Sequence, residues 1–358
     1  MNKNEVNYKV LVSCMTFNQS RYIVDAMNGF CMQKTDFPFI CVIMDDASTD
    51  GEQEVIEKYL EEHFDIDNRD TYYKKETDYA HVVFARHISN RNCYFLVFYL
   101  KENHYSQKKD KKAYLKNIQS KIEYIALCEG DDYWTDSSKL QKQADFLDNN
   151  PDYTAVYTTA ILLDNDGTQR PDRFCDSKED MDLPAELMIE GGGGIVRTVS
   201  DMHRIEVMKD YPDFATKCMV GDYPLHIFLS LKGKCRLLVK PMVVYRINAV
   251  GSWTASKKRR TIENEIAVRQ NFNDMLDGFD QYSNWKYHNS VIKTETYEVY
   301  DLLLRNKEYW KKISLSFPKV TPHFRGMVKV DNYLMTHHLS YLYNILWNIR
   351  VWRGKRHH

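Results

Sequence analysis

The sequence predicts an α/β fold around a mostly parallel sheet, and three observations support this prediction. Two short apolar runs, at residues 8–15 and 37–44, each lead into a polar loop and then into a helix-like stretch. This order is the pattern of parallel strands joined by helical crossovers. A third short apolar run, at residues 124–128, leads directly into an acidic stretch at residues 129–132. Ligands of open α/β sheets bind at the carboxyl ends of strands, so we expect the acidic stretch to lie at the functional site.

The other elements are predicted from apolar periodicity and from the residues that interrupt it. We expect helices at residues 21–32, 52–64, 113–120, 138–147, 221–231 and 257–276, and strands at residues 93–100, 153–163 and 235–247. Residues 65–80 are polar and predicted to be irregular, and a short helix is predicted to begin over residues 203–208. Beyond residue 280 the pattern favours helices with basic patches, and a linker is expected near residues 277–285.

The composition excludes several classes of protein. The chain has 358 residues, of which 43% are hydrophobic and 28% charged, and its formal net charge of −1 gives no field that would attract nucleic acid. The eight cysteines are scattered without a Cys-x-x-Cys pair, which argues against a zinc ribbon or a thioredoxin-type site. The sequence has no signal-peptide pattern and no run of 18 apolar residues, so we expect a cytoplasmic protein.

The acidic stretch contains Glu129, Asp131 and Asp132, and two interpretations of it are open. Like charges at one strand end repel each other, and a hard divalent cation with oxygen ligands, Mg²⁺ or Mn²⁺, would remove that repulsion. A solvated acidic turn that caps the following helix is, taken alone, about as frequent. A second acidic strand end, at Asp45 and Asp46, favours the metal site.

The loop at residues 46–51, with Glu57, has the spacing of a calcium-binding EF-hand loop. An EF-hand requires a helix before the loop, whereas residues 39–44 have strand character, and Ser48 stands where Asp or Asn is usual. We therefore reject a calcium site. We interpret the loop as a strand end whose carboxylates face a ligand and whose residues 48–50 cap the next helix.

Two glycine-based nucleotide motifs are absent from the sequence. No Gly-x-Gly-x-x-Gly follows the first strand, where residues 16–20 are Thr-Phe-Asn-Gln-Ser instead. The four glycines at residues 191–194 are not followed by Lys-Ser or Lys-Thr, so they do not form a P-loop. We expect these glycines to lie in a mobile loop beside the site.

Three stretches, at residues 10–18, 42–51 and 127–134, together resemble the family 2 nucleotide-sugar glycosyltransferases in order and spacing. The resemblance extends over about residues 8–255. It implies a GT-A fold, an α/β domain with a Rossmann-like, mostly parallel central sheet flanked by helices. Residues 1–255 would form this domain, with a nucleotide-binding half over about 1–135 and an acceptor half over about 136–255. Residues 256–358 would form a C-terminal helical extension.

The resemblance also implies roles for individual residues in donor binding. Thr16, Phe17 and Asn18 would lie beside the base and ribose of the donor, and Asp45 or Asp46 would contact the base through a ring N–H. The metal-binding Asp-x-Asp motif of the family corresponds here to Glu129-Gly130-Asp131, with Glu in place of the first Asp. We expect Asp131, with Glu129 and the adjacent Asp132, to hold Mn²⁺ or Mg²⁺.

The resemblance assigns two later segments to the reaction. Asp222 matches the position of the family's catalytic base; its alternative role is to cap the helix that follows it. Tyr245 and Arg246, with Gly251-Ser252, resemble the segment that closes over the diphosphate. Asn248 stands two residues after Arg246, where a His is common in the family.

The implied activity is inverting transfer of a hexosyl or N-acetylhexosaminyl group from a nucleotide sugar, expected to be UDP-linked. The acceptor would be a glycan or lipid-linked glycan in bacterial surface-polysaccharide biosynthesis. A non-catalytic sugar-nucleotide-binding scaffold with the same fold is the alternative, and such a scaffold would not need Asp222. A nucleotidyltransferase is disfavoured, because no glycine-rich basic loop follows the first strand.

The C-terminal segment carries a further pattern. Six apolar residues can share one helical face: Leu339, Leu342, Ile345, Leu346, Ile349 and Trp352. The basic residues Arg350, Arg353, Lys355 and Arg356 cluster near them, as in helices that lie on an anionic bilayer surface. A helix that docks on the rest of the protein is the more common explanation, and we hypothesise peripheral membrane contact beside it.

Overall fold

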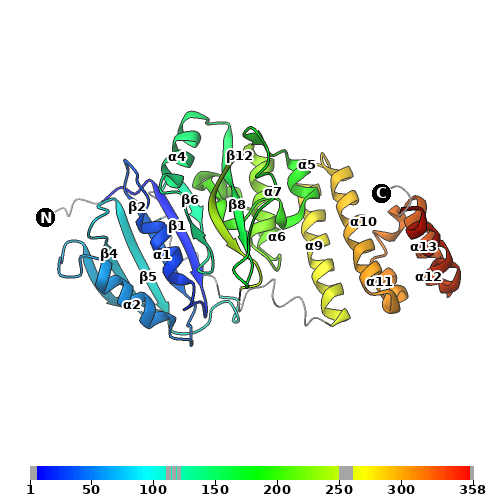
Figure 1. Ribbon diagram of the computed structural model, residues 1–358, viewed down its shortest axis with the longest axis horizontal. Coiled ribbons are helices and arrows are strands. Elements are labelled where there is room, and N and C mark those ends of the chain that lie inside the picture. Colours follow the sequence, from blue (N-terminus) through cyan, green and yellow to red (C-terminus); the bar gives the residue numbers. More distant parts are fainter. Residues whose placement is uncertain (1–5, 110–113, 115–117, 119–121, 250–260, 355–358) are drawn as a thin grey trace. The chain divides into compact units, whose positions relative to one another are not determined.

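The computed structural model describes residues 6–109, 114, 118, 122–249 and 261–354 (Figure 1). The chain divides into two compact units, and each unit is built from three separate stretches of the sequence. The first unit contains residues 1–184, 192–211 and 225–258, and the second contains residues 185–191, 212–224 and 259–358. The predicted domain boundary at residue 255 falls outside the described residues and stays a prediction, as does the helix predicted at residues 113–120.

Among the described residues, the first unit contains a 12-stranded mixed sheet. Its strands are β1 (Val10–Thr16), β2 (Phe39–Asp45), β3 (Tyr72–Glu76), β4 (Ala80–Arg86), β5 (Cys93–Leu100), β6 (Tyr124–Leu127), β7 (Tyr133–Trp134), β8 (Tyr153–Leu163), β9 (Gln169–Pro171), β10 (Met181–Asp182), β11 (Met202–Arg204) and β12 (Lys234–Arg246). Its longer helices are α1 (Ile23–Cys31), α2 (Glu52–His63), α4 (Lys139–Asn149) and most of α7 (Asp222–Lys232).

The centre of the sheet is parallel. The strands lie in the order β10-β12-β8-β11-β6-β1-β2-β5-β4-β3, and the pairs β6–β1, β1–β2 and β2–β5 are parallel. The β8–β12 pair is also parallel, whereas β11 lies antiparallel between β6 and β8. The carboxyl ends of β6, β1, β2 and β5 therefore meet at one edge of the sheet.

Alternating side chains of the central strands form two cores. Val10, Val12 and Cys14 of β1 face one core, which helices α1, α2 and α4 cover with apolar residues. Leu11 of β1 faces the opposite core, together with alternate residues of β2 and β5. Because β1 and β2 are buried on both faces, they read in the sequence as continuous apolar runs.

The second unit, among its described residues, is helical. Its helices are α5 (Ala185–Glu190), α6 (Asp213–Thr216), α9 (Ile262–Tyr282), α10 (His288–Arg305), α11 (Trp310–Ser316), α12 (Gly326–Thr336) and α13 (Ser340–Gly354). The most buried members of its apolar core are Val299, Leu303, Ile313, Phe324 and Tyr343. No helix in the described ranges is both long and apolar enough to span a bilayer.

The structure corrects three expectations about individual elements. Residues 72–76 form β3 within the stretch predicted to be irregular, because an antiparallel partner, β4, provides its hydrogen bonds. His203 lies in β11, paired with both β6 and β8, and the predicted helix is a 3₁₀ turn that begins only at Ile205. The linker predicted near residues 277–285 is not a linker over residues 277–282, because helix α9 continues through them to Tyr282.

Candidate functional site

Three strand ends bring the predicted donor-binding residues to one edge of the sheet. Thr16 ends β1 and pairs directly with Asp45, which ends β2. Gly130, in the turn after β6, donates its backbone N–H to the Met15 carbonyl over 3.1 Å. The three sequence motifs therefore meet in space because parallel pairing aligns the ends of their strands.

The acidic turn, residues 129–132, brings its three carboxylates together. Ligand oxygens of Glu129, Asp131 and Asp132 all lie within 4.8 Å of one another. A Cβ at position 130 would lie 2.3 Å from Thr16 Oγ1 and 2.4 Å from Gln19 Oε1, so a larger residue there would force these side chains or the turn to shift. Gly130 therefore packs the acidic turn closely against the end of β1.

The burial of the turn fits a divalent cation. Glu129 is exposed, whereas Asp131 and Asp132 are buried, with exposed fractions of 8% and 1%. Burial raises the pKa of both aspartates, and the pKa of Asp132 is raised well above its usual range, with the charge of Asp131 adding to the effect. Asp132 Oδ2 is buried and has no hydrogen-bond partner among the described residues. Oxygen ligands with uncompensated charge suit Mg²⁺ or Mn²⁺.

Arg246, the last residue of β12, holds the acidic turn from the other side. Its backbone N–H donates to Asp132 Oδ1 over 2.7 Å, and its Nη1 donates to the Asp131 carbonyl over 2.6 Å. The guanidinium also pairs with Asp25 and lies 4.9 Å and 4.7 Å from the ring centres of Tyr22 and Tyr133. These contacts fix Arg246 at the acidic turn, and its charge offsets part of the raised pKa of Asp131 and Asp132.

Glu52, which the sequence analysis did not single out, connects the loops that follow β1 and β2. Its fully buried carboxylate is within hydrogen-bonding distance of the Thr16 hydroxyl. It also accepts the Gln19 backbone N–H over 2.9 Å and the Ser48 hydroxyl over 2.8 Å. Thr49-x-x-Glu52 has the spacing of a helix capping box. That spacing could have marked Glu52, but it would have predicted a local cap rather than this bridge.

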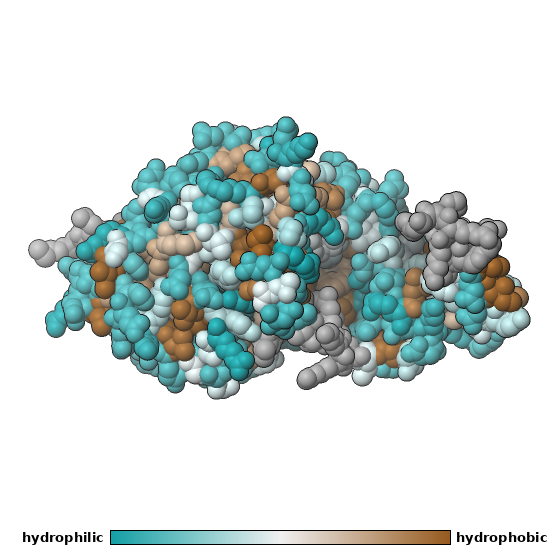
Figure 2. Space-filling view, in the orientation of Figure 1, coloured by the Kyte–Doolittle hydropathy of each residue, from teal (hydrophilic) through white to brown (hydrophobic). Residues whose placement is uncertain are grey.

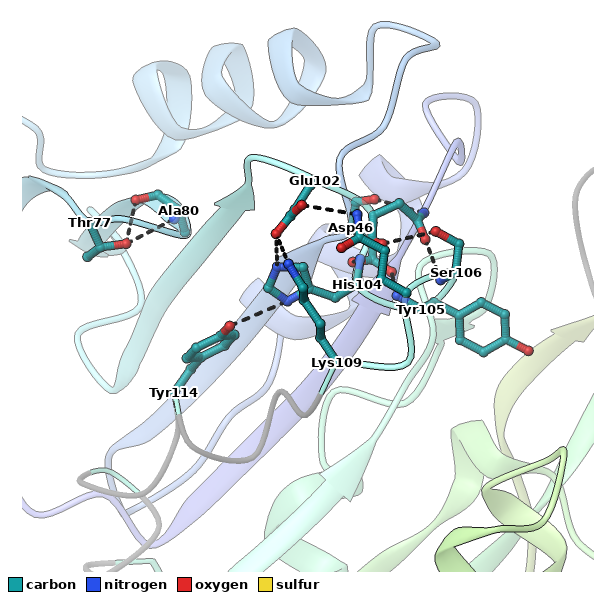
Figure 3. Close-up of polar contacts among 11 residues, drawn as sticks. Asp46, Thr77, Ala80, Glu102, His104, Tyr105, Ser106, Lys109 and Tyr114 are labelled. Atoms are coloured by element: carbon teal, nitrogen blue, oxygen red, sulfur yellow. Dashed lines mark hydrogen bonds and ion pairs between the residues drawn. The ribbon is translucent and has the colours of Figure 1, made fainter.

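The carboxylates of Asp45 and Asp46 both accept hydrogen bonds from the protein. Asp45 accepts the Ser48 backbone N–H over 3.2 Å and the Gln53 side-chain amide, and burial raises its pKa. Asp46 accepts the backbone N–H groups of His104 and Tyr105 over 2.8 Å and 2.9 Å, so its carboxylate anchors the loop after β5 (Figure 3).

Phe17 and Asn18 lie in the loop between Thr16 and α1. Phe17 is 43% exposed. Asn18 has a left-handed backbone, with φ of 55°, that asparagine tolerates better than most residues. Its backbone N–H donates to Ser48 Oγ over 2.8 Å, and its side-chain oxygen accepts the Thr49 N–H over 2.8 Å. The loop is therefore braced through Asn18, and Phe17 is presented to solvent.

Asp222 is the first residue of α7 and is grouped with the second unit. It is half-buried, and its carboxylate accepts the Tyr223 backbone N–H over 2.7 Å. A carboxylate at a helix N-terminus is stabilising, so the capping role that the sequence left open is compatible with this geometry. The role of Asp222 as catalytic base stays a prediction.

Two further charged residues of the first unit were missed from the sequence. Arg197 forms a bidentate ion pair with Asp172, in which Nη2 lies 2.9 Å from Oδ1. Its guanidinium lies 5.0 Å from the ring centre of Tyr245. Tyr245 precedes Arg246 in β12. Burial lowers the pKa of Arg197, but the pair with Asp172 outweighs burial and raises it, with smaller contributions from Tyr245 and Asp132. Neither residue belongs to a recognisable motif, so only the fold reveals that they lie near the site.

Of the four glycines at residues 191–194, the last three, Gly192–Gly194, form a 3₁₀ turn. Gly251 and Ser252 lie outside the described residues.

Comparison with solved structures identifies the class of fold. Two crystal structures of S. aureus TarS, residues 1–349, match this chain over 93% of its length. The complex with UDP matches with a TM-score of 0.53 over 91% of the TarS chain, and the complex with UDP-GlcNAc with 0.51 over 92%. Sequence identity is 15% in both, so the similarity establishes a shared α/β fold.

Comparison of sequences does not assign a family. No family model matches the chain. The uncharacterized proteins Rv1520 of Mycobacterium tuberculosis and Mb1547 of Mycobacterium bovis are each 28% identical to it over 242 residues. The match covers 67% of this chain and 59% of those proteins, so the chain spans about three fifths of their length.

Proposed function

We propose that the protein is a metal-assisted, inverting glycosyltransferase that uses a nucleotide-sugar donor, expected to be UDP-linked. The observation that carries the proposal is the acidic turn, in which three carboxylates lie within 4.8 Å of one another at the shared edge of β1, β2 and β6. The fold it shares with a protein crystallised with UDP and UDP-GlcNAc supports the choice of donor.

Glu129, Asp131 and Asp132 would hold Mn²⁺ or Mg²⁺ through their oxygens. A bound divalent cation supplies positive charge to the diphosphate that departs from the sugar. Asp132 is held in place by the Arg246 N–H, and its free Oδ2 is the ligand atom with the least competition from the protein. The Arg246 guanidinium also holds the turn through its bond to the Asp131 carbonyl.

The base and ribose of the donor would lie between the loops after β1 and β2. Thr16, Asn18 and Asp45 are fixed in these loops by the bonds to Glu52 and Ser48, so they need little reordering when a ligand binds. The exposed ring of Phe17 would cover one face of the ligand. Asp46 would act on the same site through the loop it anchors at His104 and Tyr105.

Asp222 would act as the general base. The acceptor hydroxyl loses a proton as it attacks the anomeric carbon from the face opposite the leaving diphosphate, and a carboxylate placed there takes it. Displacement from the opposite face gives inversion. The acceptor would be a glycan or lipid-linked glycan of a bacterial surface polysaccharide, in line with the resemblance of the sequence.

The test is release of nucleoside diphosphate from UDP- and GDP-linked hexoses and N-acetylhexosamines, with Mn²⁺ and with a chelator. We expect one UDP-linked sugar to be turned over in a metal-dependent manner. A non-catalytic scaffold with this fold would bind UDP but release nothing from any donor, with or without added glycan acceptors. Turnover that is unchanged by the chelator would contradict the metal-assisted mechanism.

A further inference from the structure

Helices α12 and α13 leave an unusually large set of apolar side chains in contact with solvent. Nine side chains, with exposed fractions from 36% to 75%, make up what we call the C-terminal apolar face: Met327, Val330, Tyr333, Leu339, Tyr341, Leu342, Ile345, Leu346 and Ile349. Figure 2 shows hydrophobic atoms on the surface at the end of the view where α12 and α13 lie. Single exposed apolar residues are ordinary, but a contiguous group indicates an interaction surface.

Helix α13 has two apolar sides, and among the described residues the protein buries one of them and leaves the other exposed. Tyr343 is fully buried and stacks against Trp347, with ring centres 6.0 Å apart, and on the same side Arg350 pairs with Asp331 over 2.7 Å. Leu342 and Ile345 lie on the outer side. The docking role expected for this helix is therefore filled by the Tyr343 side, and docking does not account for the outer residues.

The charge of this part of the chain is strongly positive. Residues 309–358 contain nine Lys or Arg and a single acid, Asp331. Their formal net charge is +8, which leaves −9 for the rest of a chain whose total is −1. Because Asp331 is buried and paired with Arg350, it offers no negative charge at the surface.

A cavity of about 720 Å³ adjoins the apolar face. Lys311, His337 and His338 line it, and Tyr333 of the apolar face stacks on His337 with ring centres 4.2 Å apart. Basic and hydrogen-bonding side chains thus lie directly beside exposed apolar ones. This combination matches the chemistry of a phospholipid, which has an anionic headgroup above an apolar chain.

We propose that the C-terminal apolar face docks on an anionic phospholipid membrane, with headgroup phosphates at the cavity lined by Lys311, His337 and His338. Apolar side chains enter the boundary between headgroups and acyl chains, while basic residues attract the anionic surface. Lys312 pairs with Glu263 and Lys319 with Asp277, so the unpaired excess of positive charge is smaller than +8. A second copy of this chain still fits less well, because two such segments would bring like charges together. The inference depends on the C-terminal helices alone and is independent of the proposed glycosyltransferase activity.

The test is co-sedimentation of the full chain with vesicles of phosphatidylcholine alone and of phosphatidylcholine with phosphatidylglycerol. We expect binding to the anionic vesicles only, and loss of most of it at 0.5 M salt, because surface charges are screened. The double variant Leu342→Asp/Ile345→Asp should weaken binding at least about tenfold, because two apolar contacts with the bilayer become charged. Lys311→Glu should also weaken it by about tenfold.

The matched control is Tyr297→Ser, which removes an aromatic ring that is 70% exposed on α10. This variant should bind vesicles as the wild type does. Circular dichroism and gel filtration of each variant verify that it remains folded. Equal binding to both kinds of vesicle, or binding that survives the double variant, would overturn the proposal. A dimer of the wild type that the double variant abolishes, without vesicle binding, would assign the face to a second copy instead.

Discussion

The backbone N–H of Arg246 donates to Asp132 Oδ1 over 2.7 Å and thereby ties the end of β12 to the acidic turn. These residues are 114 positions apart in the sequence. The bond satisfies one oxygen of a buried carboxylate and leaves the other without a partner in the described structure. The protein therefore holds one oxygen of the Asp132 carboxylate, and the other oxygen can act as a ligand to a metal ion.

The side chain of Arg246 makes contacts that its backbone bond does not replace. Arg246→Met keeps the N–H to Asp132 but loses the bond to the Asp131 carbonyl, the ion pair with Asp25 and two ring contacts. We expect the free energy of unfolding to fall by about 1–3 kcal/mol in urea denaturation. Arg170→Met, which removes a largely exposed ion pair with Asp164, should cost at most about 0.5 kcal/mol. Equal losses in the two variants would mean that Arg246 does not hold the turn.

The packing of Gly130 leads to a second prediction. In Gly130→Ala the new methyl group overlaps Thr16 Oγ1, which lies 2.3 Å from the Cβ position, so the turn must shift. We expect a loss of stability of about 1–3 kcal/mol and weaker metal-dependent nucleotide binding. Gly194→Ala is the matched control, because the nearest atom to its Cβ position is 3.9 Å away. Thermal unfolding and UDP titration of both variants check this, and unchanged binding in Gly130→Ala would show that the turn tolerates the shift.

Lys139 gives the stability a pH dependence of known sign. Its ammonium group is fully buried in α4, 2.8 Å from Gln143 Oε1 and 4.2 Å from the ring centre of Trp134, and burial lowers the pKa of Lys139 to about 7. In the unfolded chain the pKa is about 10.4. The unfolded state binds more protons between these values, so the contribution of Lys139 to stability is complete above about pH 10.4, declines as the pH falls from there, and is lost below about pH 7.

The comparison that isolates Lys139 is with Lys139→Met. The stability of the wild type relative to this variant should rise between pH 7 and pH 10, by at most about 1.4 kcal/mol per pH unit. Lys142→Met, on the same helix but paired with Asp136 near the surface, should leave the wild-type pH dependence unchanged. Urea denaturation at four or five pH values measures both, and parallel curves for wild type and Lys139→Met would contradict the prediction.

Asp222→Asn separates catalysis from helix capping. Asn caps a helix about as well as Asp, so stability should change by less than about 1 kcal/mol. If Asp222 is the general base, sugar transfer should fall about 10²–10⁴-fold while UDP binding is retained. Asp213→Asn, at the first residue of α6 in the same unit, should leave transfer unchanged. Transfer at the wild-type rate in Asp222→Asn would leave Asp222 with the capping role alone.

The central strands and the meeting of the three motifs could be predicted from the sequence. Strands buried on both faces, such as β1 and β2, have continuous apolar runs, and parallel pairing then brings their polar ends together. The predicted strand at residues 153–163 is confirmed as β8, with the same bounds. The α/β fold class with a largely parallel sheet is confirmed as well.

The missed features depend on contacts that apolar periodicity does not reveal. β3 is mostly polar and exposed, and only its pairing with β4 makes it a strand. Glu52 has the position of a helix-capping residue, and its bonds to Thr16 and Gln19 appear only when β1 and β2 lie side by side. The two sides of α13 cannot be separated by periodicity alone, because apolar residues occupy both.

The most direct test of the central claim is calorimetric titration of UDP into the wild type, Asp131→Ala and the control Glu62→Gln, each with and without Mn²⁺. Glu62 lies on the exposed side of α2, where its carboxylate pairs with Lys58, and no role in the site is proposed for it. We predict Mn²⁺-dependent UDP binding in the wild type and in Glu62→Gln, and its loss in Asp131→Ala. UDP binding that is the same with and without Mn²⁺, or the same in Asp131→Ala as in the wild type, would contradict a nucleotide–metal site at the acidic turn.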